Sequence, residues 1–295
     1  MSIAAKRRYA AAGFLTLLIL SVLWPSPVVS INQLWIDEDI DVDHLSFLGR
    51  EAPSWDVVFW CLAGILLFAI VQSAERGADP RQPLRQLRAA TLPRHLGRRA
   101  AIGIFAGAVA TAMVWLIADM AVLAWAVRIQ TEWTQDLVRL LNRFGGGMNP
   151  AIIVFFFIVA GVSYLERRWV GYGLAMGLAG LTAGITAQII KHLVGRARPE
   201  LWLGPTHYAA YSTSFPSGHT VGAFALAGVL FFGARSIALR VVAILLAIGV
   251  GMSRILAFRH WASDVTASAA IGLIAAALAV AMFVSEPDRE SKIET

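Results

Sequence analysis

Residues 253–264 read SRILAFRHWASD, and this stretch joins two apolar runs, 238–256 and 262–284, each long enough to cross a bilayer. It puts Arg254 at the end of one expected membrane helix and His260 four residues before Asp264, at the start of the next. Ionisable side chains at such positions are costly unless they have a partner or a function. The stretch therefore predicts a membrane helix bundle and shows where its chemistry lies.

Two other stretches also lie at the ends of apolar runs. Residues 191–199, KHLVGRARP, follow the run 170–190, and residues 216–219, PSGH, open the run 218–235. Together the three stretches read K-x6-RP, PSGH and SR-x5-H-x3-D. They supply three permanent cations, two histidines and a carboxylate. This set of groups is suited to holding a phosphate, attacking it with an imidazole and protonating the group that leaves.

The composition is that of a membrane protein. The chain has 295 residues, of which 58% are hydrophobic and only 15% are charged, whereas soluble domains average about 25% charged residues. Its single cysteine, Cys61, excludes an internal disulfide. Apolar runs predict about eight membrane helices. They lie near 9–31, 57–74, 101–127, 150–165, 170–190, 218–235, 238–256 and 262–284.

The net charge of +6 follows the topology of a membrane protein. If the N-terminus is cytoplasmic, most Lys and Arg residues fall in cytoplasmic segments, including the basic loop 74–100, as the positive-inside rule requires. The first outer loop is acidic instead. Its acidic residues are Asp37, Glu38, Asp39, Asp41 and Asp43. This distribution explains the basic composition without nucleic-acid binding, which we exclude.

The first apolar run has an alternative interpretation as a signal peptide, because residues 6–8 are basic and an apolar segment follows. The segment is followed by Trp24-Pro25-Ser26-Pro27 and not by a small-x-small cleavage site. We therefore expect an uncleaved first helix. Cleavage would leave seven helices and an outside N-terminus.

Counting helices from a cytoplasmic N-terminus tests whether the motifs can meet. Odd-numbered helices then run outward, so the fifth helix delivers Lys191 to the outer face and the seventh delivers Arg254. The sixth begins at the PSGH motif, and the eighth begins near His260 and Asp264. All three motifs are thus predicted on the outer face of the membrane, and both termini on the cytoplasmic side.

The cations suit a phosphate, which carries about −1.5 to −2 charge. Arg198 shares a face with Lys191 if the helix continues to Pro199, and an Arg side chain offers a forked donor set that matches phosphate oxygens. At the start of the next helix, Ser217 can donate its hydroxyl, and Gly218 lets the backbone approach an anion. Taken singly, the cations also resemble anchors that reach the membrane interface.

The two histidines are expected to have different roles. Asp264 is four residues after His260, so a helix would stack the pair, and the carboxylate could hold the proton of one ring nitrogen while the other attacks. His219 has no carboxylate three or four residues away, so it is expected to be the acid that protonates the leaving oxygen.

The three motifs resemble those of the type 2 phosphatidic acid phosphatase (PAP2) superfamily. The resemblance covers roughly residues 101–284 and implies an all-α polytopic membrane bundle with a six-helix core, to which this chain adds two N-terminal helices. It implies that His260 is the nucleophile, which forms a phosphohistidine, that Asp264 orients it and that His219 is the acid. It further implies that phosphate is bound by Lys191, Arg198, Ser217, Gly218 and Arg254. Vanadium haloperoxidases share the motif set but are soluble enzymes.

We expect three parts: residues 1–100 with two helices, a catalytic core over 101–285, and a cytoplasmic tail over 286–295. No motif indicates a metal or another cofactor. Asp119, inside the third apolar run, either has a function or lies near enough to the end to reach water. Residues 131–144 are expected to form a helix that lies in the outer interface or packs on the bundle.

The function expected from these features is hydrolysis of a membrane lipid phosphate or diphosphate in the inner (plasma) membrane, with the active site on the periplasmic face. A lipid phosphotransferase would share every motif, whereas a channel or transporter would place its charges along the midplane. The sequence does not indicate an oligomeric state. Isoprenyl diphosphate is the first candidate substrate, ahead of phosphatidylglycerophosphate, phosphatidate and lipid A.

Overall fold

The structure is a computed structural model that describes residues 81–90, 96–145, 149–164, 166–200 and 213–284. These residues form helices and connecting loops, and no strand occurs among them. The helices are α4 (Gln82–Ala89), α5 (Leu96–Ile117), α6 (Asp119–Arg128), α7 (Glu132–Gly145), α8 (Asn149–Ser163), α9 (Arg167–Val194), α11 (Gly218–Gly233), α12 (Ile237–Leu256) and α13 (Ala262–Phe283). The two predicted N-terminal helices and the tail 286–295 lie outside the described residues.

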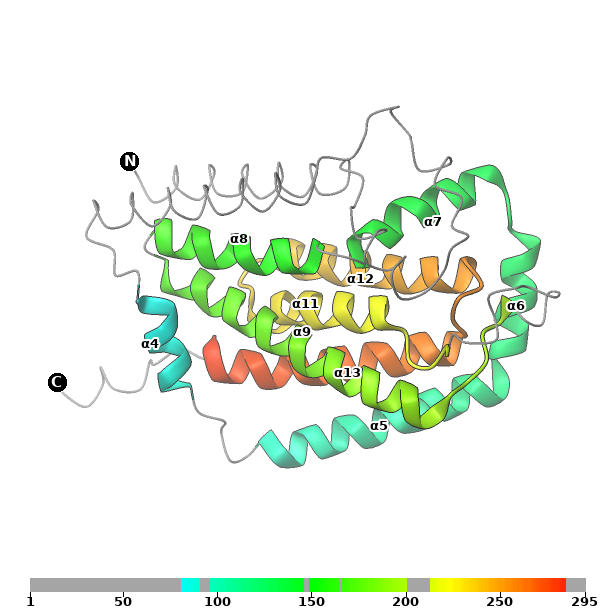
Figure 1. Ribbon diagram of the computed structural model, residues 1–295, viewed down its shortest axis with the longest axis horizontal. Coiled ribbons are helices and arrows are strands. Elements are labelled where there is room, and N and C mark those ends of the chain that lie inside the picture. The colour runs from blue at the N-terminus through cyan, green and yellow to red at the C-terminus, as the bar shows by residue number, and fades with distance from the viewer. Residues whose placement is uncertain (1–80, 91–95, 146–148, 165, 201–212, 285–295) are drawn as a thin grey trace.

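Among the described residues, six apolar helices run side by side in a bundle (Figure 1). The central helix α11 packs against α9, α12 and α13, while α8 packs on α9 and α5 packs on α13. Four of the six, α5, α9, α12 and α13, are long and apolar enough to cross a membrane. Helices α8 and α11 are apolar but shorter, with 15 and 16 residues. The expected six-helix, all-α membrane core is therefore confirmed.

The core of the bundle is built from small residues that let helices approach closely. Met176, Val221 and Val229 are fully buried, together with alanines from α9, α11 and α13. Gly228 of α11 faces Ala276 of α13, and a Cβ at Gly228 would lie 2.7 Å from the methyl group of that alanine. Small residues at such contacts are the usual means of packing membrane helices, because lipid provides no hydrophobic driving force between them.

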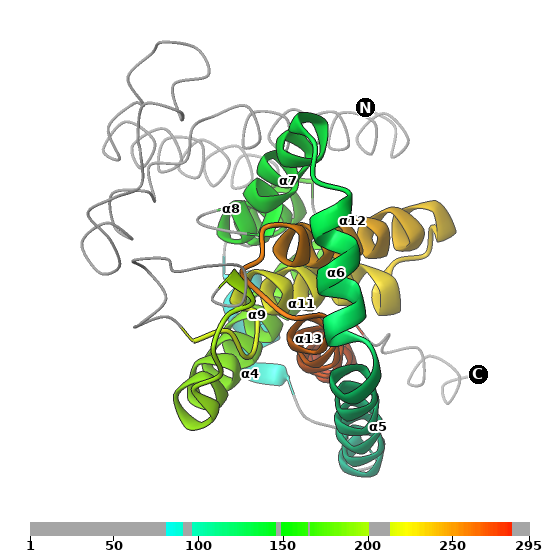
Figure 2. The same cartoon turned by 90° about the vertical axis from the view of Figure 1, so that its right-hand side faces the viewer.

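One end of the bundle is closed by two helices that cross it. Figure 2 shows α6 in front of the ends of α12 and α13, with α7 above it beside α8. Helix α7 packs on α12, and Leu141 lies against Gly249 of that helix, while Trp133 remains 72% exposed. Helix α7 thus packs on the bundle and also exposes an aromatic side chain.

The prediction of a single long helix over 101–127 is wrong. The chain forms α5 up to Ile117 and turns at Ala118 into α6, which runs in another direction (Figure 1). Asp119, the first residue of α6, is buried and paired with Arg196, which holds the chain at this point. An apolar run carries no signal for such a turn, because the turn depends on a partner 77 residues away.

Arg168 connects α9 with the end of α11 at the opposite end of the bundle. Arg168 donates to the hydroxyl of Tyr172 at 2.7 Å and to the backbone oxygen of Gly233 at 2.8 Å. Tyr172 donates to the same oxygen at 2.7 Å. A cation at the C-terminus of α11 satisfies a carbonyl that has no helical partner and complements the helix dipole.

The packing of α13 on α11 predicts which glycine tolerates a side chain. A Cβ at Gly272 would lie 2.8 Å from three atoms of α11, namely the Val221 oxygen, the Phe224 Cβ and the Ala225 nitrogen. Gly272→Ala should therefore separate the helices and destabilise the protein by about 1–3 kcal/mol.

Gly184 of α9 is the matched control, because a Cβ there meets nothing within 4 Å. Gly184→Ala should leave stability unchanged or raise it by roughly 0.5–1 kcal/mol through helix propensity. Thermal unfolding of the two variants in detergent measures the difference. Equal melting temperatures would contradict the close approach of α11 and α13.

Candidate active site

The three motifs meet at the end of the bundle that α6 and α7 cover. Helix α9 ends just after Lys191, α12 ends just after Arg254, and α11 and α13 begin at Gly218 and Ala262. These four helices run alternately up and down, so their motif-bearing ends lie together (Figures 1 and 2). The structure therefore brings all the predicted site residues to one end of the molecule, as the helix count predicted.

The path of the first motif differs from the expectation of a helix that continues to Pro199. Helix α9 ends at Val194, and Gly195 has a left-handed backbone with φ 59°, a conformation that glycine adopts without strain. Arg196 and Arg198 therefore lie on a non-helical segment that turns across the end of the bundle. The glycine ends the helix, and the proline does not.

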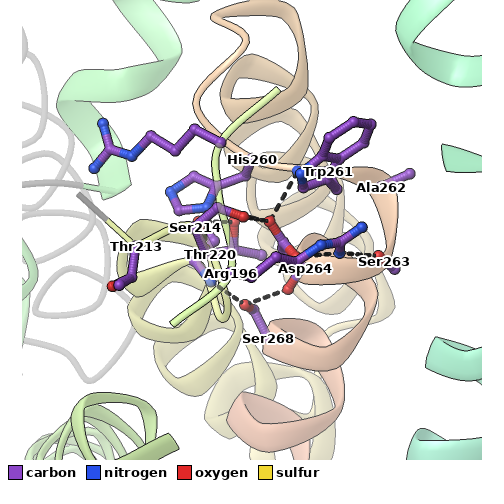
Figure 3. Close-up of polar contacts among 12 residues, drawn as sticks. Arg196, Thr213, Ser214, Thr220, His260, Trp261, Ala262, Ser263, Asp264 and Ser268 are labelled. Carbon is purple, nitrogen blue, oxygen red and sulfur yellow. Dashed lines mark hydrogen bonds and ion pairs between the residues drawn. The ribbon is translucent and has the colours of Figure 1, made fainter. Parts of the chain in front are cut away.

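Asp264 is fully buried and accepts hydrogen bonds from three other residues. Its Oδ1 accepts from Nη1 of Arg196 at 2.7 Å, and its Oδ2 accepts from the backbone N–H of Trp261 at 2.9 Å. Oδ2 also accepts from the hydroxyl of Ser214 (Figure 3). These three donors compensate for the loss of water around a buried carboxylate.

His260 is also buried, and its Nδ1 lies 2.6 Å from the backbone oxygen of Ser214. A carbonyl oxygen can only accept, so in the neutral imidazole Nδ1 carries the hydrogen and Nε2 keeps a free lone pair. The expected direct partner, Asp264, is farther away, with its Oδ2 at 3.8 Å from Nδ1. The ring is therefore oriented by a carbonyl, with the carboxylate next to it.

Each of the three motif cations has a polar neighbour in the site. Nζ of Lys191 donates to the backbone oxygen of Thr213 at 3.0 Å, and Arg198 lies 3.7 Å from a carboxylate oxygen of Glu200. Nη1 of Arg254 donates to Oδ1 of Asn142 at 2.9 Å. The Nε of Arg254 is buried, and no hydrogen-bond acceptor for it occurs among the described residues. This N–H is available to an oxygen of a bound anion.

The cations and histidines are near enough to affect one another electrostatically. Lys191 interacts with Arg198, Arg254 and Asp264, and His219 interacts with His260 and the same three cations. A concentration of positive charge with so few acidic neighbours is the environment that an anionic ligand needs.

The PSGH motif forms the start of α11. Ser217 is the N-cap residue and is buried; its N–H donates to the hydroxyl of Ser268 at 2.8 Å, and its Oγ accepts from Thr220 at 2.9 Å. Gly218 is exposed, and a Cβ there would meet nothing within 4 Å, so the helix N-terminus faces open space. This is a suitable site for an anion.

Four polar residues of the site lay outside the predicted set or had no assigned role. Ser214 and Arg196 each precede a predicted residue by a few positions, which is the only signal in the sequence. Asn142 of α7 contacts both Ser253 and Arg254. Asp119 is 4% exposed and accepts from Arg196 at 2.7 Å, so it neither reaches water nor lies free for chemistry.

Asp119 also holds the start of α13. Its carboxylate accepts from the backbone N–H of Ser263 at 2.8 Å and from the hydroxyl of that serine at 2.6 Å. Arg196 thus lies between two carboxylates, Asp119 and Asp264, and its guanidinium also lies over the Trp261 ring at 5.0 Å from the ring centre. The part of the chain that the structure describes holds no group of three or more His, Cys, Asp or Glu side chains arranged to bind a metal.

Comparison with known proteins gives consistent results. Residues 168–287 match the sequence model of the PAP2 superfamily. A lipid A 1-phosphatase of Rhizobium johnstonii is 34% identical over 160 residues, which cover 47% of this chain and 63% of that relative. Phosphatidylglycerophosphatase B of Bacillus subtilis is 28% identical over 168 residues, covering 53% of this chain and 79% of that protein.

The chain thus spans less than two thirds of the Rhizobium johnstonii relative. The crystal structure of a transmembrane PAP2-type phosphatidylglycerolphosphate phosphatase from Bacillus subtilis superposes with a TM-score of 0.52 at 22% identity, over 61% of this chain and 93% of that one, which shows a shared fold. The matched region 168–287 includes all three motifs and every predicted site residue. By its motifs, its bundle and this match, the region 168–287 of the chain is similar to the PAP2 superfamily.

Proposed function

We propose that this protein is a membrane phosphatase that hydrolyses a lipid phosphate through a phosphohistidine on His260. The observation that carries the proposal is the hydrogen bond from Nδ1 of His260 to Ser214, because it leaves Nε2 as a lone-pair donor beside the motif cations. An imidazole held in one tautomer next to a concentration of positive charge is suited to attack a phosphorus atom.

Binding of the phosphate is assigned to five residues. Lys191, Arg198 and Arg254 neutralise its charge, while Ser217 and the N–H groups at Gly218 donate to its oxygens. These groups would also stabilise the extra charge of the transition state, which is the usual source of most of the rate in phosphoryl transfer. The side chains supply this charge themselves, so the mechanism needs no metal.

The reaction has two steps. In the first, Nε2 of His260 forms a bond to phosphorus as the bond from phosphorus to the lipid oxygen breaks, and His219, protonated in the complex because the phosphate charge offsets the surrounding cations, gives its proton to that oxygen. In the second, His219 takes a proton from water, the water oxygen bonds to phosphorus, and the phosphorus–nitrogen bond breaks. Inorganic phosphate leaves and His219 is protonated again.

The protonation state of His260 agrees with this role. Burial lowers the pKa of His260 to about 4, with a further lowering from Arg254 and Lys191 and an opposite effect from Asp264. His260 is therefore neutral near pH 7 and does not have to lose a proton before it attacks.

The substrate class follows from the position of the site. The motifs lie at the ends of membrane-spanning helices, so a lipid can present its headgroup there without leaving the bilayer. The relatives include lipid A 1-phosphatases and a phosphatidylglycerophosphatase, which favours a glycolipid or glycerolipid phosphate. Neither kind of relative acts, by its name, on isoprenyl diphosphate, so lipid A 1-phosphate becomes the first candidate substrate and isoprenyl diphosphate a later one.

The site is assigned to the periplasmic face of the inner membrane. Among the described residues, the opposite end of the bundle carries basic side chains and a single acidic one, Glu166, and the positive-inside rule assigns such an end to the cytoplasm. The basic residues are Arg81, Arg85, Arg88, Arg98, Arg99, Arg167, Arg168, Arg235 and Arg240.

Replacing the two histidines should affect turnover differently when the leaving group of the substrate is changed. His260→Asn should abolish turnover of every substrate and prevent trapping of a phosphoenzyme, because no nucleophile remains. His219→Asn should reduce lipid turnover by about 10²–10⁴-fold, the range of general acid catalysis, but should retain much more activity on an aryl phosphate whose leaving group needs no proton.

Rapid quenching with radiolabelled substrate, together with steady-state rates on both substrates, tests this assignment. A phosphoenzyme that still forms in His260→Asn would remove His260 as the nucleophile. Equal losses on the two substrates in His219→Asn would remove His219 as the acid.

The low pKa of His260 should make stability depend on pH. An unfolded histidine has a pKa of about 6.5, whereas the pKa of His260 in the folded protein is about 4. Between these two pKa values the unfolded chain binds more protons than the folded protein, so the free energy of unfolding falls as the pH drops through this window. The folded protein has the full stability that goes with a neutral His260 only above about pH 6.5.

His260→Asn removes this titration and keeps a side chain that can donate to Ser214. The apparent melting temperature in detergent should therefore fall more steeply between pH 6.5 and 4.5 for the unmodified protein than for His260→Asn. Parallel curves would contradict a neutral, buried His260.

The substrate class is tested with purified protein in detergent that contains EDTA and no added metal. We expect phosphate release from lipid A 1-phosphate or phosphatidylglycerophosphate with a kcat/KM at least about 100-fold above that for glycerol phosphate, since binding of the lipid chains contributes only to the former. Undecaprenyl diphosphate and phosphatidate complete the panel, and His260→Asn controls for contaminating phosphatases.

Equal rates on lipid and soluble esters would refute the lipid class, and a requirement for magnesium would refute the metal-free mechanism. Product analysis separates hydrolysis from transfer. Hydrolysis releases one phosphate for each lipid dephosphorylated, whereas a phosphotransferase would yield less phosphate and a newly phosphorylated lipid.

A further inference from the structure

We infer that Ser214 is a positioning residue for the nucleophile, and that Asp264 orients the ring of His260 through this serine while it acts on the charge of the ring directly. The inference rests on the proposed function and deepens it. Ser214 lies two residues before the PSGH motif and is completely buried. Its three polar groups all bind residues of the other two motifs (Figure 3).

Each bond of Ser214 fixes a different part of the site. Its N–H donates to the backbone oxygen of Arg196 at 2.7 Å, its hydroxyl donates to Oδ2 of Asp264, and its carbonyl oxygen accepts from Nδ1 of His260 at 2.6 Å. The carbonyl of Ser214 therefore selects the tautomer of His260. The hydroxyl and the N–H fix the direction of that carbonyl.

The Asp264 oxygen nearest His260, Oδ2, already accepts two hydrogen bonds and makes none with the histidine. The two donors to Oδ2 are Ser214 and the N–H of Trp261, while Oδ1 accepts from Arg196. The distance of 3.8 Å between Oδ2 and Nδ1 permits an electrostatic effect on the ring but is too long for a hydrogen bond. The carboxylate can thus stabilise positive charge on His260, but the direction of the ring depends on Ser214.

Arg196 keeps this arrangement in place from two sides. Its backbone oxygen holds the N–H of Ser214, and its guanidinium holds Asp264 and, on the far side, Asp119 of α6. The serine and the carboxylate are therefore attached to the same residue. Loss of the Ser214 hydroxyl should free its carbonyl to rotate while the ion pairs hold the helices together.

The test compares Ser214→Ala, Asp264→Asn and the double variant. Ser214→Ala should lower kcat by about 10–100-fold with little change in KM, because the phosphate-binding groups are untouched. Asp264→Asn should cost about 10³–10⁴-fold, by analogy with the orienting carboxylate of a catalytic triad. The double variant should be close to Asp264→Asn alone, because both changes break the same connection.

Ser163→Ala is the matched control. Its hydroxyl is buried at the far end of the bundle and has no hydrogen-bond partner among the described residues, so turnover should not change. Ser214→Thr keeps the hydroxyl and should recover most of the activity of Ser214→Ala. If the extra methyl of threonine lowers the melting temperature, the comparison of the double variant with the two single variants tests by itself whether Ser214 and Asp264 act through one connection.

The tautomer of His260 distinguishes a positioning role of Ser214 from a purely structural one, because a structural role would leave the tautomer unchanged. With ¹⁵N-labelled histidine, the protein should show His260 as a single neutral form protonated at Nδ1, assigned by its absence in His260→Asn. Ser214→Ala should show a mixture of the two neutral tautomers. This measurement needs no turnover, so it stays informative even if His260→Asn retains activity and the proposed reaction fails.

Either of two results would overturn the inference. The first is a Ser214→Ala variant with unchanged kcat and a single Nδ1-protonated His260. The second is a double variant whose loss equals the product of the two single losses, which would mean that the serine and the carboxylate act independently on His260.

Discussion

The ion pairs of Arg196 are the interaction on which the catalytic end of the bundle depends. This guanidinium lies 2.7 Å from a carboxylate oxygen of Asp119 and 2.7 Å from one of Asp264, and both acids are almost fully buried. A buried carboxylate without a partner costs several kcal/mol. Pairing with one cation lets the fold keep two such groups, and it connects α6, the segment after α9 and the start of α13.

This arrangement explains why the helices are interrupted at the end of the bundle that carries the site residues. Helix α9 stops at Gly195, α5 turns into α6 at Ala118, and α11 begins only after the loop that carries Ser214. Each break brings a polar group to the same place. Non-helical backbone near a membrane is tolerated where its N–H and C=O groups are satisfied inside the protein, as those of Ser214 are.

The division of tasks in the site follows from its electrostatics. The buried carboxylates of Asp264 and Asp119 and the partly buried Arg196 between them form a hydrogen-bonded framework next to His260. By contrast, the Nε of Arg254 has no protein acceptor in the described part of the chain. A framework that is already satisfied provides rigidity, whereas an N–H without an acceptor provides a place for a phosphate oxygen.

The amino-acid sequence by itself determined the membrane class, the approximate bounds of five of the six core helices, and the end of the bundle at which the motifs meet. Those features depend on hydrophobic runs and on spacing along the chain, which are local. Tertiary structure alone decided that Ser214 and not Asp264 holds Nδ1 of His260, and that Asp119 turns the first core helix toward Arg196. Both depend on hydrogen bonds and ion pairs between residues far apart in sequence, and hydrophobic periodicity contains no information about such pairs.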